Sequence, residues 1–448
     1  MNVFHVIKCK IQQIYYMQIR QHKLCLFSIK IPLSHYIILF CILLLLCLFN
    51  LFMKYQTFLE MKKGRVFEAT IVLHYTKKEN SERFKLQDSQ DNIFYATYKG
   101  KFKSLTGKKA LVYGKIYRCS FLRFLRSCNI YNSSLSLIPS EDRKLALRKF
   151  INSQHESPLP ANLYNALFFA DNLLQPLRQS SIALGLAHVI AISGFHLAAL
   201  SLMFYIIICP FYFLLHRFFC YRNAVYDLGF IGLIFAYCYL VLIDFEPSFL
   251  RAFLMSCFAY LMLFCGLKIT NFLNLFFCVL FALSFNISLL FHIGFLLSIA
   301  GVFCIFLFIR HIGAMLACCN RFYKLLIGVI LFDFIIFLQM TPIVHYFFPQ
   351  FSPYQLVSIP ISICFVFLFP FVVVAHVFGF GDIFDSIILR VVEHDFVLSQ
   401  LYTPLWFLIV YLLLCFLAMR FLLAYFLSIG CAFVFYVINL RLFLIQLA

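Results

Sequence analysis

Charged residues are scarce in this chain. They make up 12% of its 448 residues, about half of the share found in ordinary soluble domains. Disordered chains combine low hydrophobicity with high charge density, and soluble enzymes need a polar surface, so both classes are excluded. Hydrophobic residues instead account for 63%, and 60 residues are Phe. Because a transmembrane helix takes about 20 apolar residues, the chain has room for many spans and one soluble module.

Several motifs of enzyme chemistry are also missing. There is no P-loop of the form G-x-x-x-x-G-K-[ST] for ATP. The 18 cysteines include no CxxC pair, and no Cys/His cluster has the spacing typical of zinc. The sequence therefore predicts no cofactor and no metal site.

The positive charge is concentrated in one segment. Of the 37 Lys and Arg, 21 lie between Lys54 and Lys149, against nine Asp and Glu from Glu60 to Glu156. This stretch is also the only long one that is not strongly apolar, which indicates a soluble domain at 54–157. An excess of this size suits a polyanion, either nucleic acid or anionic lipid headgroups, while a simply soluble basic surface is the alternative.

The N-terminal residues predict the orientation in the membrane. Residues 1–30 carry Lys and Arg but no acidic residue, and 31–53 form an apolar run long enough to span the bilayer. No small-residue cleavage site follows this run, so we expect an uncleaved anchor. Positive charge before the first span places residues 1–30 in the cytoplasm and the basic domain outside.

Further apolar runs bring the expected number of membrane segments to about ten. After the anchor they end near Leu215, cover about 224–243, end near Lys268, cover 270–286, end at Ile309, and cover 325–347, 355–378, 404–419 and 421–440. The charged turns between the earlier runs alternate as the positive-inside rule requires. On this reading 158–380 is a transmembrane channel domain. Residues 381–402 form an interfacial amphipathic segment on the cytoplasmic face, and 403–448 form a final pair that brings the C-terminus inside.

Alternating apolar and polar residues predict strands in the soluble domain. The candidates are 67–75, 92–98, 110–117 and 129–137. Four or five short strands favour a small Greek-key barrel of the OB type. The expected fold class is thus a polytopic α-helical membrane protein with one small all-β OB-like domain. Such barrels bind single-stranded nucleic acid through basic grooves and stacked aromatics. Tyr95, Tyr98 and Tyr113 are candidates for stacking, with a core position as the alternative.

The same domain holds basic pairs and two cysteines. The candidate DNA-binding residues lie in a short loop and in an amphipathic helix near the end of the domain: Arg123, Arg126, Arg148 and Lys149. The helix would equally suit a position on lipid headgroups. Cys119 and Cys128 lie in an extracytoplasmic, oxidising location, so we expect a disulfide that pins the loop between them to the barrel.

Polar residues and glycines interrupt the apolar part at several places. The most informative is GLAHVIAISGFH, from Gly185 to His196. Irregular backbone at membrane depth is tolerated only where it is buried or lines a wet cavity, and intramembrane polar residues are functional candidates. We expect one polar cavity in the outer half of the membrane, lined by His188, Ser193, Gly194, His196, Arg251, Gly294 and Ser298.

At these places the chain resembles the ComEC-type family of competence DNA-uptake channels. Residues His188 to His196 resemble its HLLAISGLH signature, with Phe195 in place of Leu. Weaker similarities follow the order of the family: Ala166 to Asp171 (A-L-L-x-G-D, with Ala170 for Gly), Pro247 to Ala252 (P-x-x-x-R-A), Gly294 to Ser298 (GFQLS, with Leu296 for Gln) and Gln355 to Pro360 (N-L-L-A-I-P, with Gln355 for Asn).

The resemblance implies a short-form channel in the bacterial inner membrane that imports single-stranded transforming DNA. Many members also carry a metallo-β-lactamase-like nuclease domain with an H-x-H-x-D-H cluster for two metals. This chain lacks that cluster, so we expect no enzyme activity. Expected partners are single-stranded DNA, the lipid bilayer, an outer DNA receptor, a separate nuclease, and a cytoplasmic motor or single-strand-binding protein. Assembly into a homo-oligomer is left open.

Two other functions fit parts of the sequence. A transporter of lipid or another anionic solute would use the same basic domain and Arg251. An intramembrane serine protease would use Ser193, because the segment around it resembles the nucleophile region of rhomboid enzymes. His292, His345 or His376 would then act as general base. The protease alternative leaves the basic barrel unexplained.

Overall fold

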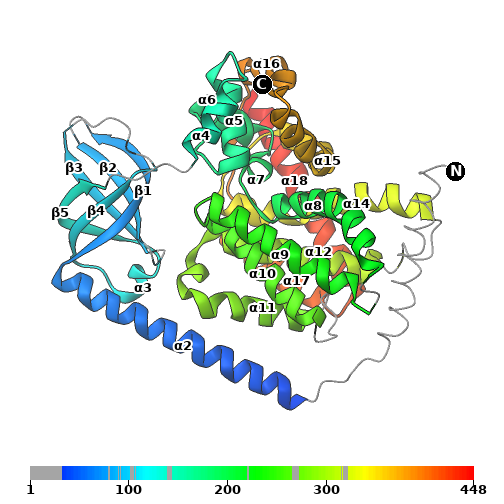
Figure 1. Cartoon of the computed structure of the whole chain (residues 1–448), viewed down its shortest axis with the longest axis horizontal. Coiled ribbons are helices and arrows are strands. Elements are labelled where there is room, and N and C mark those ends of the chain that lie inside the picture. Colours follow the sequence, from blue (N-terminus) through cyan, green and yellow to red (C-terminus); the bar gives the residue numbers. More distant parts are fainter. Residues whose placement is uncertain are drawn as a thin grey trace.

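The chain forms a small β-barrel and a larger helical bundle, which one long helix joins (Figure 1). The computed structural model describes residues 33–447 apart from 79–80, 89, 91, 101–104, 106, 139–143, 219–220, 265–271, 314 and 316–320. The expected cytoplasmic segment 1–30 therefore lies outside the described residues. The predicted fold class, a polytopic α-helical membrane protein with an OB-like domain, is confirmed.

Helix α2, Leu33–Lys63, connects the two parts. It ends ten residues beyond the predicted anchor, because it continues past residue 53 without a break. Its first half packs on helix α11, Phe272–Phe285. In its last turns Phe58 and Met61 are buried in the barrel core. The membrane anchor and the support of the barrel are thus one continuous helix.

A buried lysine fixes the barrel to this helix. The Lys54 ammonium donates to the Gln90 carbonyl at 2.5 Å and to Asn92 Oδ1 at 2.8 Å. Asp88 accepts from the backbone N–H groups of Gln90 and Asn92. Burial raises the pKa of Asp88, although these hydrogen bonds and the Lys54 charge act in the opposite direction. Because an unpaired buried charge is costly, the cluster holds this turn of the barrel against α2 in one orientation.

Five strands close the barrel in the order β1-β2-β3-β5-β4. They are β1 Arg65–Lys78, β2 Ser81–Asp88, β3 Ile93–Lys99, β4 Lys109–Ile116 and β5 Cys128–Leu137. Four of them match predicted strands, and β2 is the additional one. A register shift in β1 between Ile71 and Leu73 turns His74 inward. The His74 ring stacks on Phe84, and its Nε2 lies 2.6 Å from a Glu82 oxygen.

A disulfide joins Cys119 to Cys128, whose Cα atoms are 6.2 Å apart. The loop that it closes contains the short helix α3, Phe121–Phe124, between β4 and β5. Arg123 and Arg126 of this loop are exposed. The crosslink therefore holds two guanidinium groups outward at a fixed place on the barrel.

Loss of this disulfide is expected to destabilise the barrel. In the chain-entropy model a loop of this length contributes about 2–3 kcal/mol, so the double variant Cys119→Ser/Cys128→Ser should lower the free energy of unfolding by that amount. Pulse proteolysis of the full chain in urea, read at cleavage sites within 65–137, measures the change. Cys41→Ser, at an exposed cysteine of α2, is the control. Equal stability of the double variant and the wild type would contradict the expectation.

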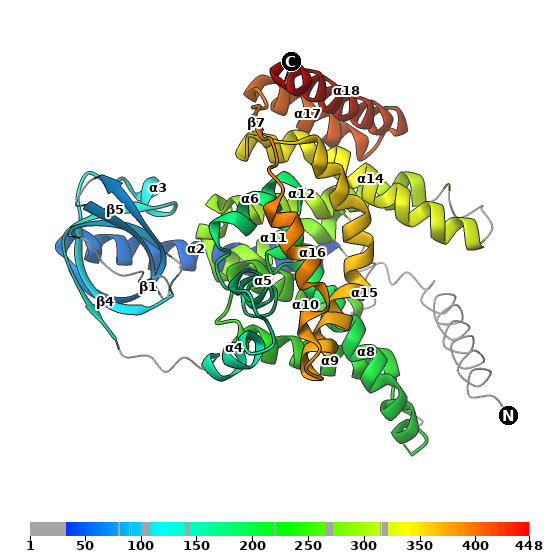
Figure 2. The same ribbon diagram turned by 90° about the horizontal axis from the view of Figure 1, so that it is seen from above.

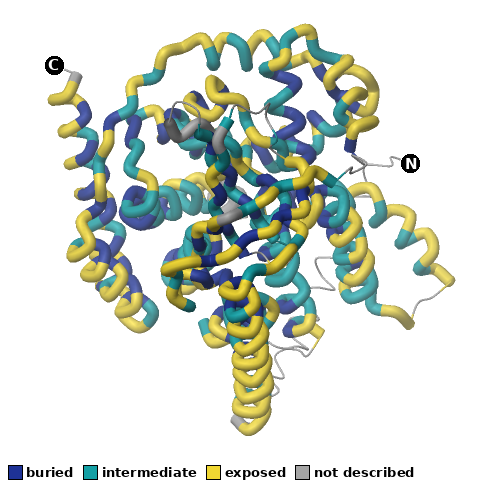
Figure 3. Tube along the Cα trace, turned by 90° about the vertical axis from the view of Figure 1, so that its left-hand side faces the viewer, coloured by how far each residue is buried: buried dark blue, intermediate teal, exposed yellow. Residues whose placement is uncertain are grey.

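The membrane helices form the bundle. Within the described residues, eight helices are long and apolar enough to cross a bilayer, and two shorter apolar helices accompany them. Besides α2 and α11 they are α8 Gly194–His216, α9 Ala224–Leu242, α10 Pro247–Phe264, α12 Ile293–Phe308, α14 Arg321–Phe347, α15 Ser358–Val377, α17 Leu405–Ala418 and α18 Leu422–Leu447. Buried residues lie toward the interior, and exposed residues follow the outer sides of the helices (Figure 3). The chain is a multi-pass membrane protein.

Helix α15 runs across the bundle, at a steep angle to α14 and α18 (Figure 2). The turn η3 that precedes it, Pro353–Val357, contacts helix α6, Gln175–Ala183. Its last turn contacts helix α5, Pro158–Phe169. Helix α16, Asp385–Glu393, follows and packs on both α5 and α6. Both ends of α15 therefore lie near the segment that follows the barrel.

Residues 381–402, predicted to lie on the cytoplasmic face, contain α16, which packs on α5 and α6. Their side of the membrane and that of the final helix pair stay predictions. Thr403 donates to the Pro342 carbonyl near the end of α14, and Phe443 of α18 returns to the same end, beside Phe351. The C-terminal end of α18 points to the same side of the bundle as the barrel (Figure 2).

Candidate functional site

The chain breaks its helical path just before α8. The short helix α7, Ala187–Ile190, follows α6 after a tight turn. Gly185 in this turn has a φ of +67°, and a Cβ there would lie 3.2 Å from the Cα of Gln355, so the close approach requires glycine. Ser193 then starts α8, because its hydroxyl accepts a hydrogen bond from the N–H of Phe195 at 3.3 Å. The predicted motif is a broken helix that is capped inside the bundle.

The start of α8 packs on α10. A Cβ on Gly194 would meet the Cβ of Ala252 at 3.4 Å, which is an ordinary van der Waals contact. Glycine at this position brings the two helices close, but the space would also admit alanine. Because Ala252 follows Arg251 in the chain, the first and second motifs of the sequence are neighbours in the structure.

Arg251 is buried and faces α12. It is 7% exposed, and its Nη2 donates to Ser248 Oγ at 3.0 Å. A Cβ on Gly294 would lie 2.9 Å from this Nη2. The glycine of α12 therefore leaves the space that the guanidinium occupies. Ser298 lies one turn further along α12 and is half-buried.

His196 faces α15 on the other side of α8. It is fully buried, and its ring lies edge-on against Phe365 and Phe369, with centroids 5.2 and 5.0 Å away. Within the part of the chain that the structure describes, neither ring nitrogen has a hydrogen-bond partner. An unpaired buried imidazole is costly, which makes His196 a functional candidate and not a packing residue alone.

The predicted channel residues thus lie in neighbouring groups around one broken helix. One group sits between α8, α10 and α12 and comprises Gly194, Arg251, Gly294 and Ser298. His196 belongs to a second face, because residues two apart point to nearly opposite sides of a helix. His188 lies in the break itself and is exposed.

The motif before the break has a structural role. Ala170 ends α5 in the left-handed conformation with a φ of +62°, a position that favours glycine. Asp171 next to it accepts a hydrogen bond from Arg148 Nη2 at 2.5 Å. Arg148 belongs to helix α4, Leu145–Asn152. This candidate DNA-binding residue is therefore committed to an ion pair within the protein.

The remaining basic candidates are accessible. Arg123, Arg126 and Lys149 are exposed. Of the three tyrosines considered for stacking, Tyr113 is 42% exposed, while the other two are partly buried. Exposed positive charge thus lies at two separate places, the disulfide-closed loop of the barrel and helix α4.

The structure adds an aromatic pair that the sequence analysis did not single out. Tyr117 and Tyr131 are 62% and 52% exposed, and their rings meet edge-to-face with centroids 6.5 Å apart. The Arg118 guanidinium lies over the Tyr117 ring at 5.4 Å. The signal was available in the alternation of exposed and buried positions, which places Tyr131 outward in β5 and continues outward at Tyr117, directly after β4. Two exposed rings beside a guanidinium are typical of a surface that stacks bases.

A hollow of about 470 Å³ lies where α6 meets the strands β6, Gln350–Phe351, and β7, Ser399–Gln400. Its lining is rich in amides and includes one guanidinium: Gln175, Arg178, Gln179, Ile182, Gln350, Leu398 and Gln400. Such groups donate hydrogen bonds to phosphates without reading the base sequence.

Gly294→Ala is expected to displace Arg251 without unfolding α12. The added methyl group would lie 2.9 Å from Nη2, at the end of a flexible side chain, so the guanidinium moves and loses Ser248. Alanine also favours the helix by about 1 kcal/mol. If the chain acts as the channel that the sequence resemblance predicts, DNA uptake into the cytoplasm should fall about tenfold, as for one lost hydrogen bond to a charged group. Gly301→Ala is the control on the same helix, because nothing lies within 4 Å of its added Cβ. Equal uptake in the two variants would contradict the role of Arg251.

Comparison with known proteins assigns the helical part to a family. The model of the family described as Competence protein matches residues 169–446, which is more than half of the chain. No curated protein and no solved structure matches it. The matched range begins at the end of α5 and contains the broken helix, Arg251, Gly294 and α15. The resemblance to the ComEC-type family is confirmed, and the chain belongs to the competence protein family.

Proposed function

We propose that this chain is an inner-membrane channel that imports single-stranded DNA during natural competence. The observation that carries the proposal is the convergence of distant motifs on the start of α8, where Gly185 meets Gln355 and Arg251 fits against Gly294. A broken helix beside a buried guanidinium suits the passage of an anion, because positive charge at membrane depth lowers the cost of a passing phosphate.

The barrel supports this function as the entry platform on the outer side. Proteins that bind single strands combine basic grooves with aromatic rings on which bases stack. Tyr117 and Tyr131 supply exposed rings, and Arg123 and Arg126 supply exposed charge on the disulfide-closed loop. The hollow beside α6, the helix that leads into the break, offers amides and Arg178 as further phosphate-binding groups.

In this proposal the chain transports DNA and does not cut it. Its sequence has no H-x-H-x-D-H cluster and no P-loop, so a separate nuclease supplies the single strand. Each phosphate that enters a negative interior works against about 2.3 kcal/mol per 100 mV. A cytoplasmic motor or single-strand-binding protein therefore draws the strand inward.

A transporter of lipid or another anionic solute is the second candidate. It would use Arg251 and the basic barrel in the same way. The exposed rings of Tyr117 and Tyr131 favour nucleic acid, because every base offers a face for stacking and a phosphate headgroup does not.

The geometry gives little support to a serine protease. The Ser193 hydroxyl accepts from the N–H of Phe195, which is the role of a helix cap. Two of the three candidate bases are engaged elsewhere: His345 Nδ1 faces the Phe348 carbonyl, and His376 Nδ1 faces the Val372 carbonyl.

The full chain in lipid nanodiscs is expected to bind labelled single-stranded DNA and leave it intact with any divalent metal. The logarithm of the binding constant should fall with the logarithm of salt concentration, with a slope of about −0.7 per neutralised phosphate. The triple variant Arg123→Glu/Arg126→Glu/Lys149→Glu should weaken binding and flatten this slope. Arg148 stays unchanged because its reversal would break the pair with Asp171.

Lys63→Glu, at an exposed residue of α2, is the matched control for added negative charge. An unchanged salt slope and normal DNA uptake in the triple variant would show that the barrel is not the platform. That result would favour the solute transporter.

The aromatic pair gives an independent test. Tyr117→Ala/Tyr131→Ala should weaken single-strand binding by about 1–3 kcal/mol per stacked base while the salt slope stays constant, because stacking releases no counterions. Leu73→Ala removes an exposed apolar side chain from another strand of the barrel and serves as the control. Fluorescence anisotropy measures both. A double variant that binds as well as the control would exclude these rings as a stacking surface.

A further inference from the structure

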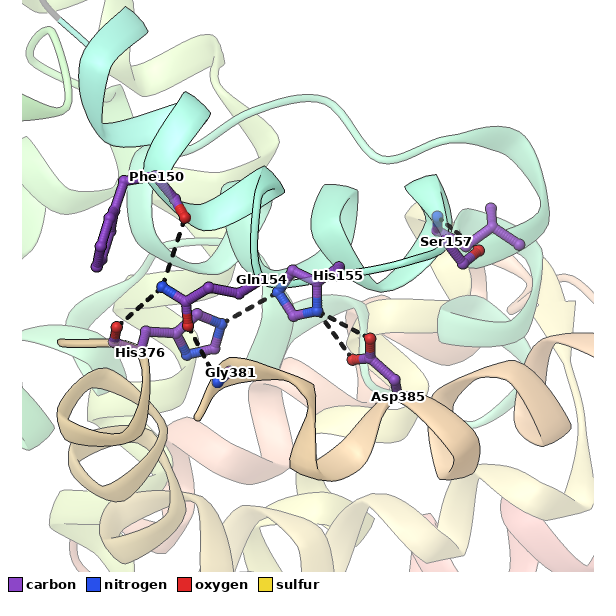
Figure 4. Close-up of polar contacts among 8 residues, drawn as sticks. Phe150, Gln154, His155, Ser157, His376, Gly381 and Asp385 are labelled. Carbon is purple, nitrogen blue, oxygen red and sulfur yellow. Dashed lines mark hydrogen bonds and ion pairs between the residues drawn. The ribbon is translucent and has the colours of Figure 1, made fainter. Parts of the chain in front are cut away.

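A polar cluster fastens the far end of α15 to the segment after the barrel (Figure 4). His155, in the turn between α4 and α5, directs Nδ1 at the Asp385 carboxylate, with its oxygens at 2.9 and 3.0 Å. Its Nε2 lies 3.3 Å from Nε2 of His376, on the last turn of α15. The His155 side chain is fully buried, and that of Asp385 is 16% exposed. Three separate elements meet at this point.

The hydrogen bonds decide how many protons the two imidazoles hold. His376 Nδ1 lies 2.7 Å from the Val372 carbonyl, which accepts only, so this nitrogen carries a proton. His155 Nδ1 likewise donates to the Asp385 carboxylate. If both rings were neutral, neither Nε2 atom would carry a proton, and their lone pairs would face each other at 3.3 Å. One additional proton between the two Nε2 atoms removes this conflict and leaves the pair singly positive beside a carboxylate.

The cluster sits at the end of the helix that covers His196. Phe365 and Phe369 of α15 lie against the His196 ring. Phe369 continues to Phe168 of α5, which in turn meets the His376 ring at 5.2 Å. A continuous series of ring contacts thus connects His196 of α8 with His376 at the end of α15.

We propose that His155 and His376 share one proton and, together with Asp385, form a pH-sensitive latch that holds α15 and α16 over His196. Only the role of His196 as a channel residue rests on the proposed function. The protonation chemistry of the latch depends on the side chains of His155, His376 and Asp385 alone.

The side chains in ring or hydrogen-bond contact with the pair, apart from Asp385, are neutral, while the exposed carboxylate of Glu156 follows His155 in the chain and lines the same surface hollow as that residue. Tyr164 of α5 stacks on His155 at 5.0 Å and meets His376 edge-on at 4.4 Å, and it is the further titratable group that faces the pair in the described structure. Gln154 donates to the His376 carbonyl and accepts from the Gly381 N–H, both at 3.0 Å. These amide hydrogen bonds do not titrate, so the change of the cluster with pH comes from the imidazole pair and Asp385.

Acid is expected to open the latch. A second proton on the pair would make both rings imidazolium ions. Like charges at this short distance repel, and the one carboxylate of Asp385 balances only one of them. At high pH the shared proton is lost, and Asp385 is left with no counter-charge from the pair. The latch is therefore strongest at intermediate pH.

Hydrogen exchange on the full chain in lipid nanodiscs tests this without any DNA. Protection of peptides covering 381–397, corrected for the intrinsic pH dependence of exchange, should be highest near pH 7 and fall about tenfold by about pH 5. In His376→Gln one imidazole remains, so the loss of protection in acid should disappear. His394→Gln, at an exposed histidine of the same segment, should keep the wild-type profile.

Asp385→Asn separates a latch from a merely structural contact. Removal of the carboxylate destabilises the shared proton, so the alkaline loss of protection should move to lower pH, whereas a structural defect would lower protection equally at every pH. A flat pH profile in the wild type would overturn the proposal. So would loss of protection at pH 7 on addition of EDTA with recovery in Zn²⁺, because the shared cation would then be a metal ion. DNA uptake is not a readout, so failure of the channel function would leave these results unaffected.

Discussion

A helix that begins inside a membrane bundle leaves backbone N–H groups without partners, and this constraint organises the molecule. Ser193 satisfies one of these groups, and Gly185 lets the preceding turn fit against η3. The helices that contact α8 pack around this irregular backbone. Helix α10 approaches closely enough to place Arg251 beside α12, and α15 closes over the opposite face at His196. Polar side chains gather here because every neighbouring element has to pack against the same break.

The course of α15 also positions an acidic segment. Residues 381–402 carry four acidic residues and one basic residue: Asp382, Asp385, Glu393, Asp395 and Arg390. Helix α16 in this segment packs on α5 and α6, while the turn after α17 lies beside His311, which meets the Ala418 carbonyl. The same course brings Asp385 within reach of His155.

The barrel and the apolar helices could be predicted because periodicity and length are local properties of the sequence. Contacts between segments that are distant in the sequence are not local properties, so they could not be predicted in this way. Arg148 has the composition of a DNA-binding residue but pairs with Asp171, 23 positions further on. His74 alternates as an outward residue until the bulge in β1 turns it inward. The motif around His196 was recognised from its polar residues, yet which face of α8 meets Arg251 depends on how α10 and α15 pack.

Helix α2 sets the relation between the barrel and the bundle. Its 31 residues give a length of about 46 Å, whereas the hydrocarbon layer is about 30 Å thick. The helix is therefore longer than the layer it is predicted to cross, and in its last turns Phe58 enters the barrel core while Lys54 binds the turn at Gln90 and Asn92. In the proposed function, a barrel fixed to the bundle by one continuous helix would present a bound strand at a constant height and angle. Its affinity for the strand could then stay low enough for release into the bundle.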